Sequence, residues 1–314
     1  MTFTRRFSRV GRTANAFANP RLRRDGVRRN DSSDGGAEDR SREAEIMANG
    51  YHYGEMTWPE IKEAASRNVV AVVPIATIED HGPHLPIDTD LRLCNAVCEE
   101  AVSRARDRAL LVPAINHGYS PHHMDFPGAI TIGAHTLIDY GLDVCRSLAH
   151  HGFRKILIVN GHGSNTPFID IIARLTVVET NVLAAAINYW AAPGVREAAE
   201  GLRESEKIGG MNHACEFETS LYLAIRPDLV DMSQAAHELS HRPTKNYWTD
   251  LIGGDGPLVM MEHWSALSKT GVMGDPTKAT AEKGRTLLDA AAAGIVEIID
   301  EMLARAPAQR VDHH

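Results

Sequence analysis

The distribution of apolar and polar positions becomes regular from about residue 50 onward. Consecutive apolar residues, typical of strands buried on both faces, occupy 69–77, 109–115, 155–160 and 182–189. Apolar residues at helical spacing predict helices over 57–67, 90–106, 134–152, 166–179, 216–225 and 279–305. Strands that alternate with helices predict a parallel sheet with helices on both faces. The predicted fold class is therefore α/β, with three α/β/α layers and a mostly parallel central sheet.

The chain between residues 190 and 278 shows little periodicity. Within it only 216–225 has helical spacing, and Arg226-Pro227 ends that helix because the residue before a proline disfavours helical backbone. Residues 230–274 are rich in Gly, Pro and His, and we expect irregular structure there.

Residues 1–46 differ from the rest of the chain in composition. They are rich in arginine, contain no lysine and have few large apolar side chains, so they bury too little surface to offset their ordering entropy. We expect a disordered or non-native N-terminal extension, with Met47 as an alternative start, and one globular domain over 47–314. The segment 1–24 has no acidic residue, which leaves an organellar transit peptide as a second interpretation.

Charge and cysteine usage narrow the functional classes. The net charge of −8 over 314 residues argues against a general nucleic-acid binder. No apolar run reaches the roughly 18 residues that would predict a membrane-spanning helix. The four cysteines form no Cys-x-x-Cys pair, which favours a reduced, cytoplasmic protein over a disulfide scaffold.

Polar and charged residues gather directly after the first predicted strand. Segment 79–90 holds four carboxylates and two histidines. Glu79 and His81 are two residues apart, so at a strand end they point to the same side, and Asp90 begins the next helix. Ligands of open parallel sheets bind at the carboxyl ends of the strands. This segment therefore indicates a metal site, with a solvated acidic loop as the alternative.

Two further clusters follow along the chain. Residues 160–165, Asn-Gly-His-Gly-Ser-Asn, come after a predicted strand, and their glycines allow a tight turn that presents His162. An ordinary glycine-rich turn is the alternative, and the absence of lysine and of GxGxxG spacing argues against a phosphate loop. His213 and Glu218 lie at the start of another helix, where acidic residues also occur as ordinary caps.

Together these clusters supply nitrogen and oxygen ligands without a thiolate. The candidate metal ligands are Glu79, His81, Asp90, His162 and Glu218. Such a set suits Zn, Mn, Ni or Fe, and it is too large for one open catalytic zinc. The two oxygens of Asp90 allow it to bridge two ions, each with three protein ligands and room for water. Two cations activate water as a nucleophile at neutral pH, so no Ser or Cys nucleophile is required.

The order of these motifs resembles that of the creatininase (creatinine amidohydrolase) family. The resemblance covers about residues 52–305 and includes the segments 79–90, 160–165, 213–220, 120–128 and 271–276. It implies a creatininase-like three-layer fold, hydrolysis of an amide-type bond, and two divalent metal ions. The two ions are expected to be Zn, Mn or one of each, with Fe or Ni as the alternatives. It also implies a homo-oligomer, which is a hexamer in many members.

The resemblance also implies roles for individual residues. The family's metal ligands match Glu79, His81, Asp90 and His162. Glu218 matches an acid that is either the remaining ligand or the catalytic acid/base, and His213 matches a histidine for substrate binding and proton transfer. Ser120 matches a serine that contacts substrate, and Trp190 is a further candidate for the wall of the substrate pocket.

Two positions depart from the family pattern. Creatininase itself has a tyrosine and a ligating glutamate where this chain has Gly163 and Ser164, so the second ion depends on Glu218. Asp80 stands where glutamine is common, and its side chain adds negative charge near the ions or a hydrogen bond to a ligand. The first of these differences argues against creatinine as the substrate.

We therefore expect a dinuclear-metal hydrolase that acts on a C–N bond of a small cyclic or linear amide, other than a peptide bond. The alternatives at the same site are C–C bond hydrolysis of a cyclic keto-polyol and hydrolysis of a peptide or formamide. A metal-dependent binding protein without turnover is the alternative from another class. We expect a small-molecule substrate and neither a nucleic-acid nor a membrane partner.

Overall fold

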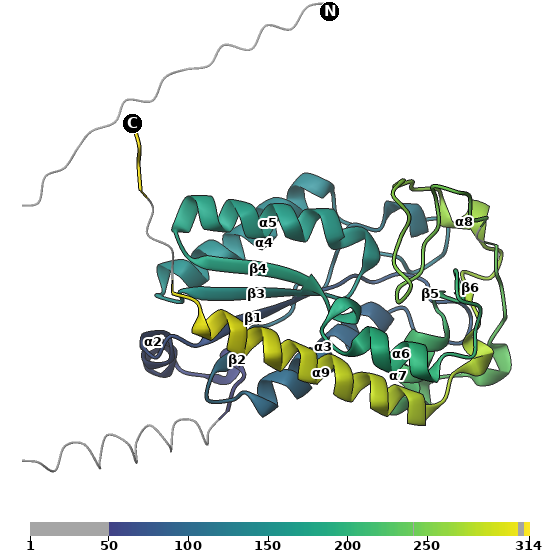
Figure 1. Ribbon diagram of the computed structural model, residues 1–314, viewed down its shortest axis with the longest axis horizontal. Helices are drawn as coiled ribbons and strands as arrows, with labels where there is room; N and C mark the ends of the chain where they lie inside the picture. Colours follow the sequence, from purple (N-terminus) through teal and green to yellow (C-terminus); the bar gives the residue numbers. More distant parts are fainter. Residues whose placement is uncertain (1–49, 241, 307–310) are drawn as a thin grey trace, which may run out of the picture. The chain divides into compact units, whose positions relative to one another are not determined.

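The fold is that of a computed structural model, which describes residues 50–240, 242–306 and 311–314 (Figure 1). The predicted N-terminal extension, residues 1–46, lies outside these residues. Within the described part, no helix has both the length and the apolar character that crossing a bilayer requires.

Four parallel strands form the central sheet in the order β2-β1-β3-β4. They are β1 (Val70–Ile75), β2 (Ala109–Leu111), β3 (Lys155–Asn160) and β4 (Leu183–Asn188). β1 and β3 pair over their full lengths, and Ile75 lies opposite Asn160. The loops that follow these two strands therefore start side by side at the carboxyl end of the sheet.

Alternate residues of the strands face opposite sides of the sheet. Val70 and Val72 pack into one core cluster, whereas Ala71 and Val73 pack into another. Helices over the first face are α3 (Thr89–Arg104), α6 (Val195–Leu202), α7 (Glu216–Ile225) and α9 (Ala281–Ala304). Helices over the second face are α2 (Trp58–Ser66), α4 (Ala134–His150) and α5 (Thr166–Thr180). Figure 1 shows α4 and α5 on one side of the sheet and α9 on the other, which confirms the predicted three layers.

The predicted strand over 109–115 is shorter in the structure. The ladder of β2 ends at Leu111, although the N–H of Val112 still donates to the carbonyl oxygen of Val72 at 2.9 Å, and Pro113 follows. Beyond the proline, Ile115 returns to β1 and makes an isolated bridge with Ile75.

The region that showed little periodicity holds several short elements. Among them, β5 (Met211–His213) and β6 (Met273–Gly274) form an antiparallel pair, and α8 (Trp264–Leu267) is a single turn. The short 3-10 helices of the described chain are η1 (Tyr53–Glu55), η2 (Pro121–His123), η3 (Gly163–Asn165), η4 (Tyr189–Ala191), η5 (Pro227–Leu229), η6 (Met232–Gln234) and η7 (Pro276–Lys278). The sequence predicted neither α6 nor the β5–β6 pair, whose strands are too short for a periodic signal.

Candidate metal centre

A closed loop brings Asp90 back to the end of β1. The backbone N–H of Glu79 donates to the carbonyl oxygen of Ile87 at 3.0 Å, which closes the loop just before α3 begins. Asp90 lies in the first turn of α3, and its Oδ1 is 3.0 Å from Nε2 of His81. Glu79, His81 and Asp90 are all buried, and their ligand atoms lie within 4.8 Å of one another.

His162 joins this group from the adjacent strand. The side chain of Asn160, at the end of β3, fixes the turn by accepting from His162 N and donating to His162 O, at 3.1 and 2.6 Å. Nδ1 of His162 then lies 2.9 Å from Asp90 Oδ2 and 3.3 Å from Glu79 Oε1. The two oxygens of Asp90 therefore face two different histidines.

Glu218 completes the set from the first turn of α7. Its Oε1 is 3.9 Å from Nε2 of His81. The ion pairs of His162 and His81 thus divide the five predicted ligands into two overlapping groups that share Asp90, although Glu79 also lies within 4.8 Å of His81. One group is Glu79, Asp90 and His162, and the other is His81, Asp90 and Glu218.

The histidine rings are oriented by backbone carbonyl oxygens. Nδ1 of His81 lies 3.4 Å from the carbonyl oxygen of Glu79, and Nε2 of His162 lies 3.1 Å from that of Tyr119. A carbonyl oxygen can only accept, so each ring donates its N–H there and turns the lone pair of its other nitrogen toward the carboxylates. Among the described residues, the buried His81 Nε2 and Asp90 Oδ2 make ion-pair contacts but no well-aligned hydrogen bond. Imidazole nitrogens that face carboxylate oxygens fit a divalent cation, which would bind in place of the protons on these rings.

The electrostatics of the group also favour bound cations. Within the described chain, the ion pairs of Glu79, Asp90 and Glu218 are all with histidines. Burial raises the pKa of Glu218 to about 7, and the carboxylate of Asp90 adds to this while His81 opposes it. Burial disfavours the charged form of His81, but the carboxylates of Asp90, Glu218 and Glu79 together outweigh burial and raise the pKa of His81 to about 10. Buried carboxylates at this spacing need positive charge beside them, which metal ions supply.

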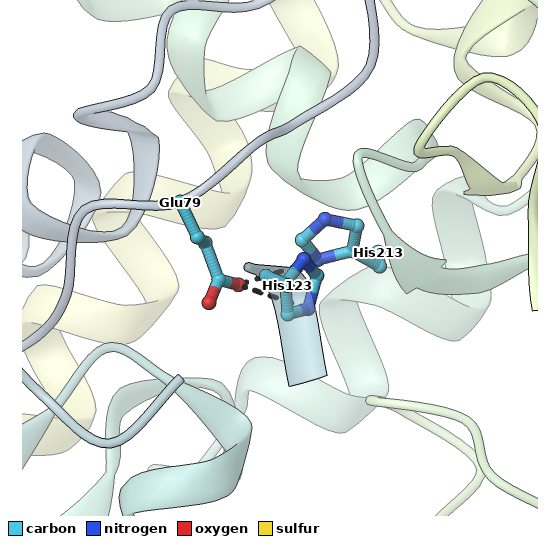
Figure 2. A group of neighbouring side chains, drawn as sticks. All are labelled: Glu79, His123 and His213. Atoms are coloured by element: carbon cyan, nitrogen blue, oxygen red, sulfur yellow. Dashed lines mark ion pairs between the residues drawn. The ribbon is translucent and has the colours of Figure 1, made fainter. Parts of the chain in front are cut away.

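His123 in η2 belongs to the site, although the sequence analysis did not select it. Its Nε2 lies 3.6 Å from Glu79 Oε1, and its Nδ1 lies 2.7 Å from Asp80 Oδ1. His213, from β5, approaches the same oxygen, with Nδ1 at 3.7 Å (Figure 2). The only sequence signal for His123 was its place in the 120–128 segment, from which Ser120 alone was selected.

Two predicted substrate contacts have structural neighbours that bear on their roles. Ser120 Oγ donates to Oε2 of Glu79, so it holds a predicted ligand in place. Trp190 in η4 packs edge-on against Tyr189, with ring centroids 5.3 Å apart. The indole beside the site histidines is instead that of Trp264, 4.6 Å from the ring of His123. Substrate binding by Ser120 and Trp190 stays a prediction.

Comparison with known proteins agrees with this geometry. Residues 54–299 match the model of the creatininase family, described as creatinine amidohydrolase. The chain is 28% identical to creatinine amidohydrolase of Pseudomonas putida over 268 residues, covering 81% of this chain and 98% of that one. It is 32% identical to the mycofactocin precursor peptide peptidase of Mycobacterium ulcerans over 256 residues, covering 79% and 85%. It is 25% identical to the 3-dehydro-scyllo-inosose hydrolase of Thermotoga maritima over 285 residues, covering 83% and 86%.

Solved structures extend the likeness to the whole fold and to the kind of site. A mutant creatininase in a zinc–zinc form superimposes with a TM-score of 0.69 at 27% identity, covering 82% of this chain and 99% of that one. A creatininase described with manganese gives a TM-score of 0.68 at 27% identity, covering 82% and 100%. These neighbours support a divalent metal site at the buried His, Glu and Asp cluster. The chain therefore belongs to the creatininase family and is a metal-dependent hydrolase.

Proposed function

We propose that this protein hydrolyses a C–N bond of a small cyclic or linear amide at a site that holds two divalent cations, zinc, manganese or one of each. The observation that carries the proposal is the position of Asp90, whose two oxygens lie 3.0 and 2.9 Å from nitrogens of two different histidines. A carboxylate in this position is suited to bridging two ions.

In this proposal the ligands divide as the two overlapping groups do. Glu79, Asp90 and His162 hold one cation, and His81, Asp90 and Glu218 hold the other. When bound, the pair of cations lowers the pKa of water and polarises the carbonyl oxygen of the substrate. Iron or nickel would suit the same ligands.

The residues around the ligands move the proton that hydrolysis releases. Attack by water forms a C–O bond, breaks the C–N bond and transfers one proton from the water to the leaving nitrogen. His213 Nδ1 faces the site with a lone pair, because its Nε2 is held 2.7 Å from the carbonyl oxygen of Asp80. Glu218 is the second candidate, since burial brings the pKa of its carboxyl to about 7, close to neutral pH.

The substrate is proposed to differ from creatinine. Ser164 stands where creatininase has a ligating glutamate, and its Oγ lies 3.1 Å from Nε2 of His122. The relatives themselves carry names that refer to creatinine, to a peptide and to an inosose. The similarity to the inosose hydrolase supports a second candidate function, C–C bond hydrolysis of a cyclic keto-polyol at the same site. Hydrolysis of a peptide or formamide bond is the third.

A substrate panel tests these proposals. The metal-loaded protein is assayed against lactams, linear amides, formamides, short peptides and cyclic keto-polyols. We expect turnover of an amide, and we expect Glu79→Ala and His162→Ala to lose both metal and activity, while the exposed control His135→Ala keeps both. Turnover of keto-polyols alone would favour the second candidate, and full metal content and activity in Glu79→Ala would refute the site.

We also propose a homo-oligomer, a hexamer by family resemblance, in the cytoplasm. In the described sheet β4 is an edge strand, and a cavity of about 700 Å³ lies along it, lined by residues of α5 and β4. Val177 and Val178 of α5 are 42% and 71% exposed beside this edge, which is the kind of surface that natural proteins cover. Light scattering on the purified protein gives the oligomer number, and a monomer at micromolar concentration would contradict this proposal.

A further inference from the structure

Three acceptor atoms of the site converge on one point, and two of them lie on residues outside the proposed ligand set. They are Oε1 of Glu79, Nε2 of His123 and Nδ1 of His213, all within 4.8 Å of one another and all on buried residues. Figure 2 shows the two imidazole rings gathered beside the Glu79 carboxylate. Of these three residues, only Glu79 belongs to the five predicted ligands.

One residue, Asp80, fixes both of these histidine rings. Its side-chain Oδ1 lies 2.7 Å from Nδ1 of His123, and its carbonyl oxygen lies 2.7 Å from Nε2 of His213. Both oxygens act as acceptors, so each ring donates an N–H to Asp80 and presents a lone pair at its other nitrogen. The point of convergence is therefore surrounded by acceptors, which select a hydrogen-bond donor or a cation.

An apolar wall closes one side of this point. The Trp264 ring stacks on His123 with centroids 4.6 Å apart and an interplanar angle of 24°, and meets His213 edge-on at 4.9 Å. The indole N–H donates to the carbonyl oxygen of Gly271 at 3.0 Å, so its polar end is already satisfied. A contact between Ser265 and Asp125 also ties α8 to the residues that follow η2.

We propose that His123, with Glu79 and His213, forms a subsite that binds an N–H group of the substrate against the face of Trp264. The substrate class is then an amide whose nitrogen carries a hydrogen, rather than a fully N-alkylated amide or an ester. Asp80 is a positioning residue, because it acts by orienting the two rings. The subsite rests on the proposed function, since it names the part of the amide that is bound beside the two cations.

A pair of lactams that differ in one N–H tests the subsite by binding. The full-length, zinc-loaded protein is titrated with 2-pyrrolidinone and with N-methyl-2-pyrrolidinone, and dissociation constants are measured by NMR. A hydrogen bond to a buried acceptor predicts that the N–H lactam binds about tenfold more tightly. In His123→Ala this ratio should fall to about one, while the zinc content of the protein stays at the wild-type value.

Two further variants separate the subsite from a purely structural effect. Asp80→Ala keeps the His123 ring but removes its acceptor, so it should also lower the ratio, whereas Asp80→Asn keeps an oxygen acceptor and should restore it. The exposed His135→Ala should leave both the ratio and the zinc content unchanged. If His123→Ala fails to fold, Asp80→Ala and Asp80→Asn give the same comparison with the His123 ring in place.

Two results would overturn the inference. An unchanged lactam ratio in His123→Ala would show that the ring does not bind the N–H group. Loss of one zinc per chain in that variant would show instead that His123 is a metal ligand. Because the readouts are binding and metal content, absence of turnover on the substrate panel would count against the proposed function alone.

Discussion

Replacing Asp90 with asparagine tests the two-cation arrangement most sharply among single substitutions. Asp90 is buried, and its two oxygens lie 3.0 Å from His81 Nε2 and 2.9 Å from His162 Nδ1. Asparagine keeps the shape of the side chain but offers one oxygen and no charge. If Asp90 bridges two ions, Asp90→Asn removes a ligand that both of them share.

The size of the effect follows from the linkage between binding and stability. An ion present at 100 times its dissociation constant stabilises the folded state by about 2.7 kcal/mol. The described chain has about 260 residues, for which the entropy of unfolding is about 0.5 kcal/mol/K. Each ion should therefore raise the Tm by about 5 °C, and two independent ions by about 10 °C.

The assay combines calorimetry with elemental analysis of dialysed protein. The wild type should bind two zinc ions per chain and gain about 10 °C, whereas Asp90→Asn should retain one ion at most and gain about 5 °C or less. Asp88→Asn is the matched control, because Asp88 bonds to Arg92 and Tyr222 rather than to the site histidines. Two ions per chain and the full rise in Tm in Asp90→Asn would refute the bridging role.

Three further predictions concern other parts of the molecule. Asp250→Ala should lower the free energy of unfolding, measured in urea, by about 3–5 kcal/mol. The buried Asp250 accepts from the Arg203 guanidinium and from three backbone N–H groups, all of which the substitution leaves without this acceptor. A loss below about 1 kcal/mol would contradict this reasoning. Burial lowers the pKa of His84 to about 4, so between pH 6.5 and 4 the unfolded state binds the extra proton and stability falls as the pH falls. The urea midpoint should therefore fall less between pH 7 and pH 4.5 in His84→Gln than in the wild type. Equal falls in the two proteins would argue against a lowered pKa of His84. Glu218→Gln should reduce the zinc content from two ions to one if Glu218 is a ligand, whereas retention of both ions with lost turnover would assign it as the acid/base.

The layered fold followed from the sequence because its strands and helices carry their own signals. Every residue of β1 and β3 is buried, and such strands appear in the sequence as uninterrupted apolar runs. The helices that flank them are long enough to show apolar residues at helical spacing. By contrast, β2 has only three residues, and α6 and β5 are too short to stand out from the surrounding loop.

The candidate metal ligands could be selected from the sequence because each follows or begins a regular element. Glu79 and His81 follow β1, His162 follows β3, and Asp90 and Glu218 begin helices. The structure brings these five side chains together, and metal analysis of the variants will test their roles.

His123 could not be selected in the same way. It lies in a long loop without periodicity, and it reaches the site through contacts with Asp80 and Trp264, which are 43 and 141 residues away along the chain. Trp264 was missed for the same reason, since α8 is a single turn within a region predicted to be irregular. Trp190 was a candidate by its residue type, which does not predict where an indole packs.

The central claim is that two cations share Asp90, and anomalous diffraction from crystals of the zinc-loaded protein tests it most directly. The account predicts two anomalous peaks per chain on either side of the Asp90 carboxylate. One peak should lie between Glu79 and His162, and the other between His81 and Glu218. A single peak, or a peak bound by His123 and His213 in place of either of these, would contradict it.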